Sequence, residues 1–406
     1  MRPFSRATPV LLALSLAAPP AALAQPAERV AAPVRVSGQV FEDTNGNGRR
    51  DPGESGLAGT MVSDQVSVTT TDGEGRFALD ASGYGFVFLI QPDGYLVRGA
   101  WWRSARADAP VDFPLRKLDQ GSSFRFVHAS DTHISEQSLP RMRRLRAMVD
   151  SIHPDFVLLT GDLVRDALRV PESEATGYYE LLMRELARFS VPVFTTLGNH
   201  EIFGIERHQS LVPASHPLYG KRMYRSYLGP NYYAFTWGGV HFLSLDTVDY
   251  LDLEYFGHVD PVQLEWLRQD VARLPIGMPV VTFNHIPLTS PSPVLFGIHE
   301  EPPASSLIRI DGKLYLRHAV QNADEVLTIL DGRLDLALGG HFHRRETMTF
   351  ETASGLIRLH QTAAVTGPAF GEGPFGLRSG ITLYQVRRGQ VDDGQFIPLD
   401  PDRAPE

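Results

Sequence analysis

The stretch Gly340-His341-Phe342-His343 follows the apolar run Leu334-Asp335-Leu336-Ala337-Leu338, which predicts a buried strand that ends in two imidazoles. Four further apolar runs also end in side chains that can bind a metal. They are residues 124–127 before Asp131-Thr132-His133, 156–159 before Gly161-Asp162, 191–194 before Gly198-Asn199-His200-Glu201, and 280–283 before Asn284-His285. In layered α/β folds, functional groups collect on the loops beyond strand ends. We therefore expect these five sets of side chains to meet at one rim.

The composition limits the class of protein. The 406 residues include no cysteine, so disulfides and thiolate metal sites are excluded, and any metal must be held by nitrogen and oxygen. A formal net charge of −9 gives no electrostatic footprint for nucleic acid. After residue 24, no segment has about 18 consecutive apolar residues, so we expect no transmembrane segment in the mature chain.

The first 24 residues predict a cleavable signal peptide and hence a periplasmic or secreted protein. Arg2 and Arg6 precede a largely apolar run at residues 10–18, and Ala22-Leu23-Ala24 has the small-x-small pattern that signal peptidases recognise. Cleavage after Ala24 would remove two arginines and no acids, which changes the formal net charge from −9 to −9 − 2 = −11.

The remaining chain predicts two domains. Residues 25–34 predict a linker. Short alternating strands separated by Gly and Asp turns predict a small all-β sandwich domain over residues 35–118. Residues 122–399 alternate strands with helices, which predicts an α/β domain, and residues 400–406 form a polar tail.

Local signals mark several turns and helix starts in the α/β domain. Two aromatic, β-branched runs flank Gly238-Gly239, the spacing of a two-residue hairpin. Asp260 before Pro261 predicts a helix N-cap with proline at the first helical position. Asn322 with Glu325 predicts a capping box at a later helix.

The five strand-end clusters together can hold two metal ions. Two divalent cations need about eight to ten ligand atoms, usually with one bridging carboxylate, and hard nitrogen and oxygen ligands suit Mn, Fe or Zn. A lone D-x-H or H-x-H arises often by chance, and a single buried histidine is more often a hydrogen-bonded core residue. Five clusters in order, each just after an apolar run, favour a dinuclear site.

The order D-x-H, G-D, G-N-H-E, a lone His and G-H-x-H resembles the calcineurin-like metallophosphoesterase family over roughly residues 124–399. Gly239-Val240-His241-Phe242 and residues 263–267 are similar to segments of its purple-acid-phosphatase-like branch. The resemblance implies a four-layer α/β/β/α sandwich, here preceded by the small all-β sandwich domain. It also implies roles for individual residues: Asp131, His133 and His343 hold one metal, Asn199, His285 and His341 hold the other, Asp162 bridges them, and His200 is an outer-sphere acid.

The chemistry of these residues supports the same roles. Two adjacent cations lower the pKa of a shared water and clamp both oxygens of an in-line displacement at phosphorus. His200 beside them can protonate a leaving alkoxide. We therefore expect an exported phosphoesterase that hydrolyses mono- or diesters of a small phosphorylated substrate by attack of a metal-bridging hydroxide. One departure is Arg165, where the family often has Asp, Asn or Tyr; it either contacts substrate phosphate or is a solvated surface residue.

A second metal site is predicted in the N-terminal domain. Residues 43–54 fit a twelve-residue calcium loop with strand-like flanks, and they resemble calcium loops in β-sandwich repeats of bacterial surface adhesins. A Gly/Asn/Asp-rich connection without an ion explains the same residues. The candidate calcium ligands are Asp43, Asn45, Asn47, Arg49 through its carbonyl, Asp51 and Glu54.

Three alternatives remain open on sequence grounds. The chain could be a surface-binding or scaffold protein whose phosphoesterase domain binds metal but turns over weakly. The β-sandwich could be a carbohydrate or cell-wall adhesin, for which Trp101-Trp102 is the one candidate aromatic row. Residues 203–233, rich in cationic and aromatic side chains, form either a wall over a phosphorylated ligand or a packed insertion.

Overall fold

The structure is a computed structural model. It describes residues 32–106, 108–119, 121–292, 306–366 and 378–399. The predicted signal peptide (residues 1–24), most of the predicted linker (residues 25–34) and the polar tail (residues 400–406) lie outside the described residues. In the described part of the chain, no helix is both long and apolar enough to cross a membrane.

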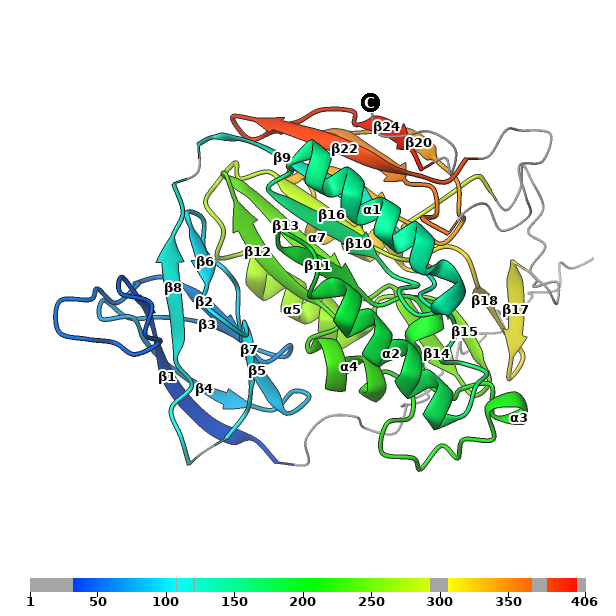
Figure 1. Ribbon diagram of the computed structural model, residues 1–406, viewed down its shortest axis with the longest axis horizontal. Coiled ribbons are helices and arrows are strands. Elements are labelled where there is room, and N and C mark those ends of the chain that lie inside the picture. The colour runs from blue at the N-terminus through cyan, green and yellow to red at the C-terminus, as the bar shows by residue number, and fades with distance from the viewer. Residues whose placement is uncertain (1–31, 107, 120, 293–305, 367–377, 400–406) are drawn as a thin grey trace, which may run out of the picture.

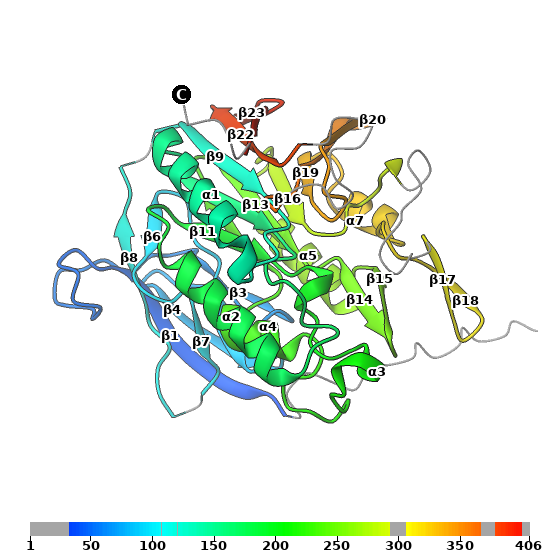
Figure 2. The ribbon, with the colours of Figure 1, turned by 45° about the vertical axis from the view of Figure 1, so that its right-hand side comes forward.

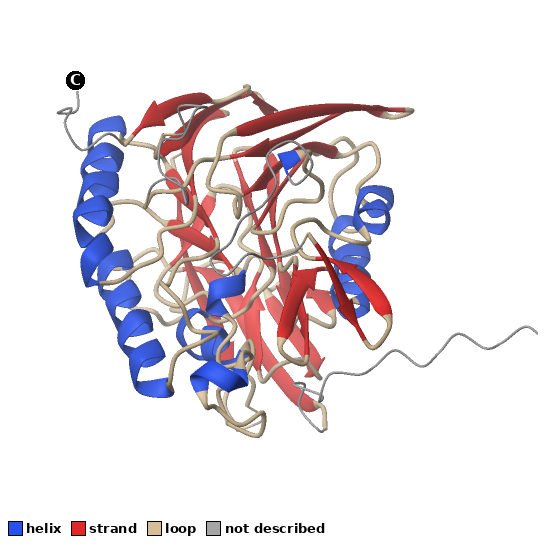
Figure 3. Ribbon diagram, turned by 90° about the vertical axis from the view of Figure 1, so that its right-hand side faces the viewer, coloured by secondary structure: helices blue, strands red, loops and turns tan. Residues whose placement is uncertain are grey.

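Two six-stranded sheets stack face to face between two layers of helices, as Figure 3 shows from the side. The first sheet has the order β11-β10-β9-β22-β23, with β24 also paired to β22. Its strands are β9 (Ser123–Ala129), β10 (Phe156–Thr160), β11 (Val193–Thr196), β22 (Gly380–Arg387), β23 (Gln390–Val391) and β24 (Gln395–Pro398). The second sheet has the order β12-β13-β16-β19-β21-β20. Its strands are β12 (Tyr233–Trp237), β13 (Val240–Leu245), β16 (Val280–Asn284), β19 (Leu334–Gly339), β20 (Glu346–Thr352) and β21 (Gly355–Gln361).

Helices cover the outer face of each sheet, which completes the predicted four-layer α/β/β/α sandwich. Helices α1 (Leu139–Ile152) and α2 (Glu172–Leu186) lie on the first sheet, and α5 (Pro261–Val271) and α7 (Ala323–Ile329) lie on the second (Figures 1 and 3). Helix α1 buries Met142, Leu145 and Val149, the side chains that recur at helical spacing. The shorter helices are η1 (Glu136–Ser138), η2 (Asn199–Glu201), α3 (Arg207–Ser210) and α4 (Arg222–Leu228).

Aromatic side chains fill the space between the two sheets. The Phe126 ring stacks on the Phe156 ring with centroids 5.3 Å apart, and Phe242 from the other sheet meets Phe156 edge-on at the same distance. Such pairs add about 0.5–1.5 kcal/mol to the free energy gained by burying their area. Because both faces of these strands are covered, they read as continuous apolar runs in the sequence.

Two of the three local predictions are confirmed in full. Strands β12 and β13 pair antiparallel around Gly238 and Gly239, whose φ angles of +57° and +80° suit the two-residue turn. The Asp260 side chain accepts hydrogen bonds from the backbone at the start of α5. The helix start predicted at Asn322 is confirmed, because this residue is the N-cap of α7, but the capping box is wrong: the side chain makes no cap hydrogen bond, and its Oδ1 accepts from the Val259 N–H, 3.0 Å away.

The N-terminal part of the chain forms an all-β region of two four-stranded sheets. Their orders are β4-β1-β8-β6 and β3-β2-β5-β7. The strands are β1 (Val34–Glu42), β2 (Met61–Ser63), β3 (Val68–Thr70), β4 (Arg76–Ala81), β5 (Phe86–Leu89), β6 (Tyr95–Val97), β7 (Trp102–Ser104) and β8 (Phe113–Lys117). Val40, Phe113 and Leu115 are among the apolar side chains that close the small core of this region.

The sheet β3-β2-β5-β7 shares its outer apolar side chains with the core of the α/β region. Phe86, Phe88 and Ile90 belong to the same buried cluster as the α/β sheets. The Trp101 ring packs against Tyr233 with centroids 4.6 Å apart, and the Trp102 indole lies against Gly229. Because packing within the molecule accounts for both tryptophans, the exposed aromatic row required by the adhesin reading does not form.

Two small hairpins extend beyond the second sheet at one end of the molecule, as Figure 2 shows. The first is β14 (Val248–Leu251) with β15 (Glu254–Gly257), and the second is β17 (Leu307–Ile310) with β18 (Lys313–Leu316). The chain that leaves β18 pairs with β15 through a bridge between Gly257 and Val320. This segment therefore lies next to the loops at the ends of β16 and β19.

Candidate metal centre

The five predicted clusters follow five strands whose ends point to one rim. Three of these strands belong to the first sheet and two to the second. Strands β9, β10 and β11 are parallel neighbours in the first sheet, and β16 and β19 are parallel neighbours in the second. Parallel strands bring their carboxyl ends to the same edge, so the first sheet contributes three clusters and the second contributes two. The site lies where these two edges meet.

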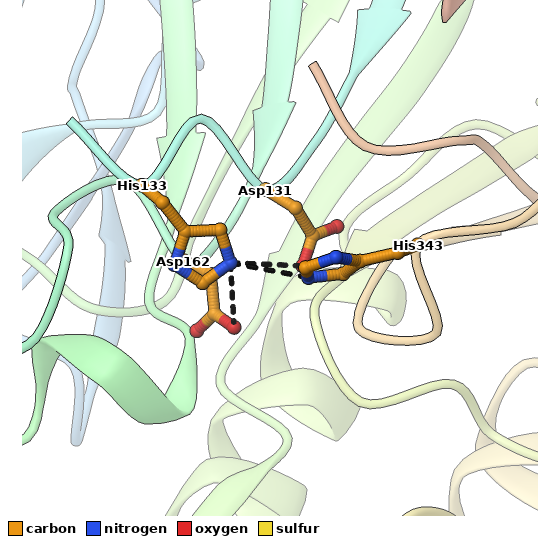
Figure 4. A group of neighbouring side chains, drawn as sticks. All are labelled: Asp131, His133, Asp162 and His343. Carbon is orange, nitrogen blue, oxygen red and sulfur yellow. Dashed lines mark hydrogen bonds and ion pairs between the residues drawn. The ribbon is translucent and has the colours of Figure 1, made fainter. Parts of the chain in front are cut away.

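One group of four side chains joins both sheets. Single ligand atoms of Asp131, His133, Asp162 and His343 all lie within 4.8 Å of one another (Figure 4). The Nε2 atoms of His133 and His343 are 3.1 Å apart, and His343 Nε2 is 3.2 Å from Asp131 Oδ1. His133 Nε2 is 3.8 Å from Asp162 Oδ2.

A second group shares Asp162 with the first. Ligand atoms of Asp162, His285 and His341 also lie within 4.8 Å of one another. His285 Nε2 is 3.1 Å from Asp162 Oδ1, 3.1 Å from Asn199 Oδ1 and 3.2 Å from His341 Nδ1. The structure thus brings together all seven residues predicted to bind metal, with Asp162 common to both groups.

The backbone at this site adopts a conformation that side chains other than glycine disfavour. Asp131, His133, Asp162, His341 and His343 all have positive φ angles, between +38° and +74°. The left-handed region costs roughly 1–2 kcal/mol for each such residue. Residues held there cluster at functional sites, where the surrounding structure fixes them.

Two glycines let the loops approach each other closely. A Cβ atom on Gly161 would lie 2.6 Å from Nδ1 of His285, and a Cβ atom on Gly340 would lie 1.9 Å from Oγ of Ser130 and 2.9 Å from Oδ2 of Asp131. Any side chain at either position would displace these neighbours. The glycine of each motif is therefore required by packing against a metal-ligand residue.

The charges of the site favour a cation between the two sheets. Burial lowers the pKa of His285, but the carboxylate of Asp162 outweighs this effect and raises that pKa to about 9. Burial raises the pKa of Asp162, yet the neighbouring His285 and His200 hold it well below its usual range. Burial and the charge of His200 lower the pKa of His133 to about 3. Ionised Asp162 therefore favours a positive charge at His285, whereas the imidazole of His133 stays neutral.

The donor set fits two metal ions. His285 Nδ1 lies 2.8 Å from the Thr160 carbonyl, which can only accept, so one proton sits there and Nε2, which faces Asp162 and Asn199, is the nitrogen that could bind an ion. Asp131 Oδ1 is buried and has no hydrogen-bond partner among the described residues. A cation at each group would replace the Nε2 proton of His285 and would satisfy the carboxylate and amide oxygens that face it. The atoms are all nitrogen and oxygen, which suits Mn, Fe or Zn.

His200, the predicted acid, lies at the edge of the first group with its side chain 22% exposed. Its Nδ1 lies 2.7 Å from the backbone carbonyl of Arg165, and its Nε2 lies 3.8 Å from Asp162 Oδ2. Burial lowers the pKa of His200, but the carboxylates of Asp162 and Asp166 outweigh it, so the pKa is raised above its usual value. The Arg165 side chain is exposed and reaches Gln137 at 3.4 Å, so it is the backbone of this residue that orients the imidazole.

Two residues contribute contacts that the motifs did not predict. Buried Glu201 accepts from the N–H groups of Val164 and Gly198 at 2.9 and 2.7 Å, so it links two loops of the site. Its pKa is raised to about 7, mainly by burial and the charge of Asp162. His318 lies 2.7 Å from His341, and no sequence motif marks it because it follows an ordinary hairpin.

Three of the cationic and aromatic side chains in residues 203–233 pack inside the molecule, whereas His208 is exposed. Lys221 Nζ lies 2.6 Å from Asp246, and buried Arg225 donates to Asn231 at 2.8 Å. Tyr224 is fully buried. This favours the packed insertion over a cationic wall for a ligand.

The predicted calcium loop is closed by hydrogen bonds. Asp43 Oδ1 accepts from the N–H groups of Gly46 and Asn47, and Glu54 accepts from those of Thr44 and Asp51. Two groups of three or more His, Asp or Glu side chains with metal-ligand geometry occur in the described part of the chain, and both are at the strand-end rim. Calcium binding by residues 43–54 stays a prediction.

Comparison with solved structures gives low-identity matches. A dimetal phosphatase from Danio rerio is 15% identical, with 68% of this chain and 99% of that chain covered and a TM-score of 0.44. The purple acid phosphatase PPD1 from yellow lupin (Lupinus luteus) is 15% identical, with 90% of this chain and 68% of that chain covered and a TM-score of 0.44. Among curated proteins, colossin-B of Dictyostelium discoideum is 46% identical over 61 residues, which are 15% of this chain and 2% of the length of that protein.

Two family profiles match the chain in separate segments. Residues 44–105 match the family described as the N terminal of calcineurin-like phosphoesterase. Residues 124–345, more than half of the chain, match the calcineurin-like phosphoesterase family, and they contain every residue of the two ligand groups. The chain belongs to the calcineurin-like phosphoesterase family.

Proposed function

We propose that this protein is an exported, metal-dependent hydrolase of phosphate mono- or diesters that uses two ions of Mn, Fe or Zn. The observation that carries the proposal is the convergence of six side chains on two groups that share the carboxylate of Asp162, with Asn199 at hydrogen-bond distance from the second group. When bound, two such ions would polarise a phosphoryl oxygen and lower the pKa of a shared water. Family membership supports the same class of reaction.

The residues of the chain would bind the two ions and supply the proton for the leaving group. Asp131, His133 and His343 would hold one ion, and Asn199, His285 and His341 the other, with Asp162 between them. His200 keeps its Nδ1 proton on the Arg165 carbonyl, so its Nε2 is the atom that exchanges a proton with substrate. The carboxylates of Asp162 and Asp166 raise its pKa and so favour the protonated imidazole, which can give that proton to a leaving alkoxide.

The rival reading, a binding or scaffold protein with little turnover, receives less support. A domain that had lost catalysis would be expected to lack part of the ligand set or of the acid, whereas every predicted ligand and His200 are present and close together. Export is supported by the sequence of residues 1–24 alone, which lie outside the described residues, and it is therefore part of the proposal. Expression of the full chain with a C-terminal tag, followed by fractionation and mass spectrometry of the N-terminus, tests cleavage after Ala24.

The experiment that tests the function is an initial-rate assay of residues 25–406. A chromogenic phosphate monoester and its diester are each supplied with Mn²⁺, and each assay is repeated with excess chelator. Hydrolysis that the chelator abolishes supports the proposal, and the faster ester gives the preferred class. No chelator-sensitive hydrolysis of either ester, in a sample that holds two ions per chain, would favour the scaffold reading.

Calcium binding by residues 43–54 is a separate proposal with its own test. Asp43, Asp51 and Glu54 place three carboxylates in one loop, and hydrogen bonds from Asn45 and Asn47 lower the pKa of Asp51. A bound ion would raise the melting temperature as the calcium concentration increases. The comparison uses wild type and Asp51→Asn in calcium and in magnesium. An equal response of both proteins would count against the site.

A further inference from the structure

We propose that His318 is a positioning residue that fixes the tautomer and the ring orientation of His341. His318 Nδ1 lies 2.7 Å from His341 Nε2, on the side of the His341 ring opposite to the metal centre. The other nitrogen of His341, Nδ1, lies 3.2 Å from His285 Nε2 and faces the second group. The inference deepens the proposed function and rests on it, because it assigns a role toward the second ion.

The direction of the hydrogen bond follows from the two nitrogens of His341. If Nδ1 offers its lone pair to an ion, a neutral imidazole carries its one proton on Nε2. That proton can only be donated to His318, so His318 Nδ1 is the acceptor and its own proton sits on Nε2. A ligand histidine that donates through its second nitrogen is held in the correct tautomer and binds the metal more tightly.

The spacing argues against an ion shared by His318 Nδ1 and His341 Nε2. Two nitrogens that share one tetrahedral ion at about 2.0–2.1 Å stand about 3.3 Å apart. The observed 2.7 Å between His318 and His341 is shorter than this and is ordinary for a hydrogen bond. In addition, His318 is not a member of either ligand group of the described residues.

The segment that carries His318 is held on both sides, which a positioning role requires. The neighbouring Arg317 pairs with Glu254 and stacks over the Tyr255 ring, 4.8 Å from its centroid. Two residues later, Val320 donates its N–H to the carbonyl of Pro287, 3.1 Å away in the loop that follows His285. His318 itself is 2% exposed, so water does not compete for its Nδ1.

The substitutions separate the hydrogen bond from the volume of the ring. His318→Leu removes the acceptor, whereas His318→Asn places a carbonyl oxygen close to the position of Nδ1. His360→Leu is the matched control, because that histidine is also buried and bonds by Nδ1 to Tyr384, 3.0 Å away, but lies outside both ligand groups. Circular dichroism and the melting temperature of each metal-free variant report folding.

The measurement is the affinity for the first and second Mn²⁺ ion, by competition with a fluorescent chelator, on the protein without its signal peptide. We expect two ions in wild type, a second ion about 10–100-fold weaker in His318→Leu, and near-wild-type affinities in His318→Asn and His360→Leu. If His318→Leu does not fold, His318→Gln, whose carbonyl lies near the Nε2 position, replaces it with the same expected loss.

Equal affinities in wild type and in the variant without the acceptor would overturn the role of His318, as would an equal loss in His318→Asn. Two bound ions in wild type without hydrolysis of either ester would instead contradict the proposed function. Fewer than two ions in wild type would contradict the dinuclear centre itself. Failure of the proposed role of His318 and failure of the proposed function therefore give different results in the same set of samples.

Discussion

Substitution of Gly161 by alanine should impair the metal centre more than it impairs the fold. The new Cβ atom would lie 2.6 Å from His285 Nδ1 and 2.7 Å from its Cβ and Cγ, where ordinary contact begins at 3.4 Å. The imidazole would have to retreat by about 0.8 Å, which would change the position of its Nε2 relative to Asp162 and Asn199. A displacement of about 1 Å in an active site costs on the order of 10²-fold in rate.

The positive φ angle of Gly161 adds a cost in folding free energy, and a control variant can measure this cost separately from the clash with His285. Gly161 has a φ angle of +78°, so alanine there costs roughly 1–2 kcal/mol of folding free energy even without a clash. Gly277 has a φ angle of +79° and no atom within 4 Å of the position of a Cβ. Gly277→Ala therefore has the same backbone cost and no contact with the site.

The assay is the initial rate of Mn²⁺-dependent ester hydrolysis, with thermal unfolding of both variants. We expect Gly161→Ala to lose about 10²-fold in rate and Gly277→Ala to keep the wild-type rate, while both lose a similar amount of stability from the backbone alone. Equal rates in the two variants would refute the reasoning that the glycine is required by contact with His285.

Three further predictions test the acid, the pH dependence and the interface. Asp162→Asn should bind less metal and lose metal-dependent turnover, whereas His200→Ala should keep its metal, measured by elemental analysis, and be slower by about 10²-fold; unchanged turnover in Asp162→Asn would exclude the shared carboxylate. Burial lowers the pKa of His360 to about 4, so as the pH falls below 6.5 the unfolded chain binds a proton at this residue that the folded protein does not, and His360 alone should lower the stability by about 1.4 kcal/mol per pH unit between pH 6.5 and 4. His360→Leu should make the measured slope shallower by one proton, and an unchanged slope would contradict this. Gly229→Ala would place a Cβ atom 2.4 Å from the Trp102 indole at a φ angle of +83°, so it should lose about 2–4 kcal/mol in denaturant unfolding, and a loss no larger than that of Gly277→Ala would contradict the packing argument.

The fold and the ligand groups could be predicted because their signals are local. Each motif follows its strand within a few residues, and a parallel arrangement of strands is enough to bring the motifs to one edge. His341 and His343 illustrate this, since the strand before them determines where both imidazoles lie. The hairpin at Gly238 is local in the same way.

The contacts that could not be predicted join residues far apart in the chain. His318 is 23 residues from His341, and its segment is brought there by pairing with β15. Trp101 meets Tyr233 across the boundary between the all-β and the α/β regions, and the sequence carries no signal for that surface. Asn322 was misread because a residue 63 positions away, Val259, competes for its side chain.

The core shared by the all-β region and the α/β sheets has a mechanical consequence. Because Phe86, Phe88 and Ile90 are buried with the α/β core, moving the two regions apart would expose these side chains to water. Burial of this shared core therefore opposes a change in the angle between the sheet β4-β1-β8-β6 and the strand-end rim. If that sheet were attached to a surface, the attachment would therefore determine the direction in which the metal centre faces.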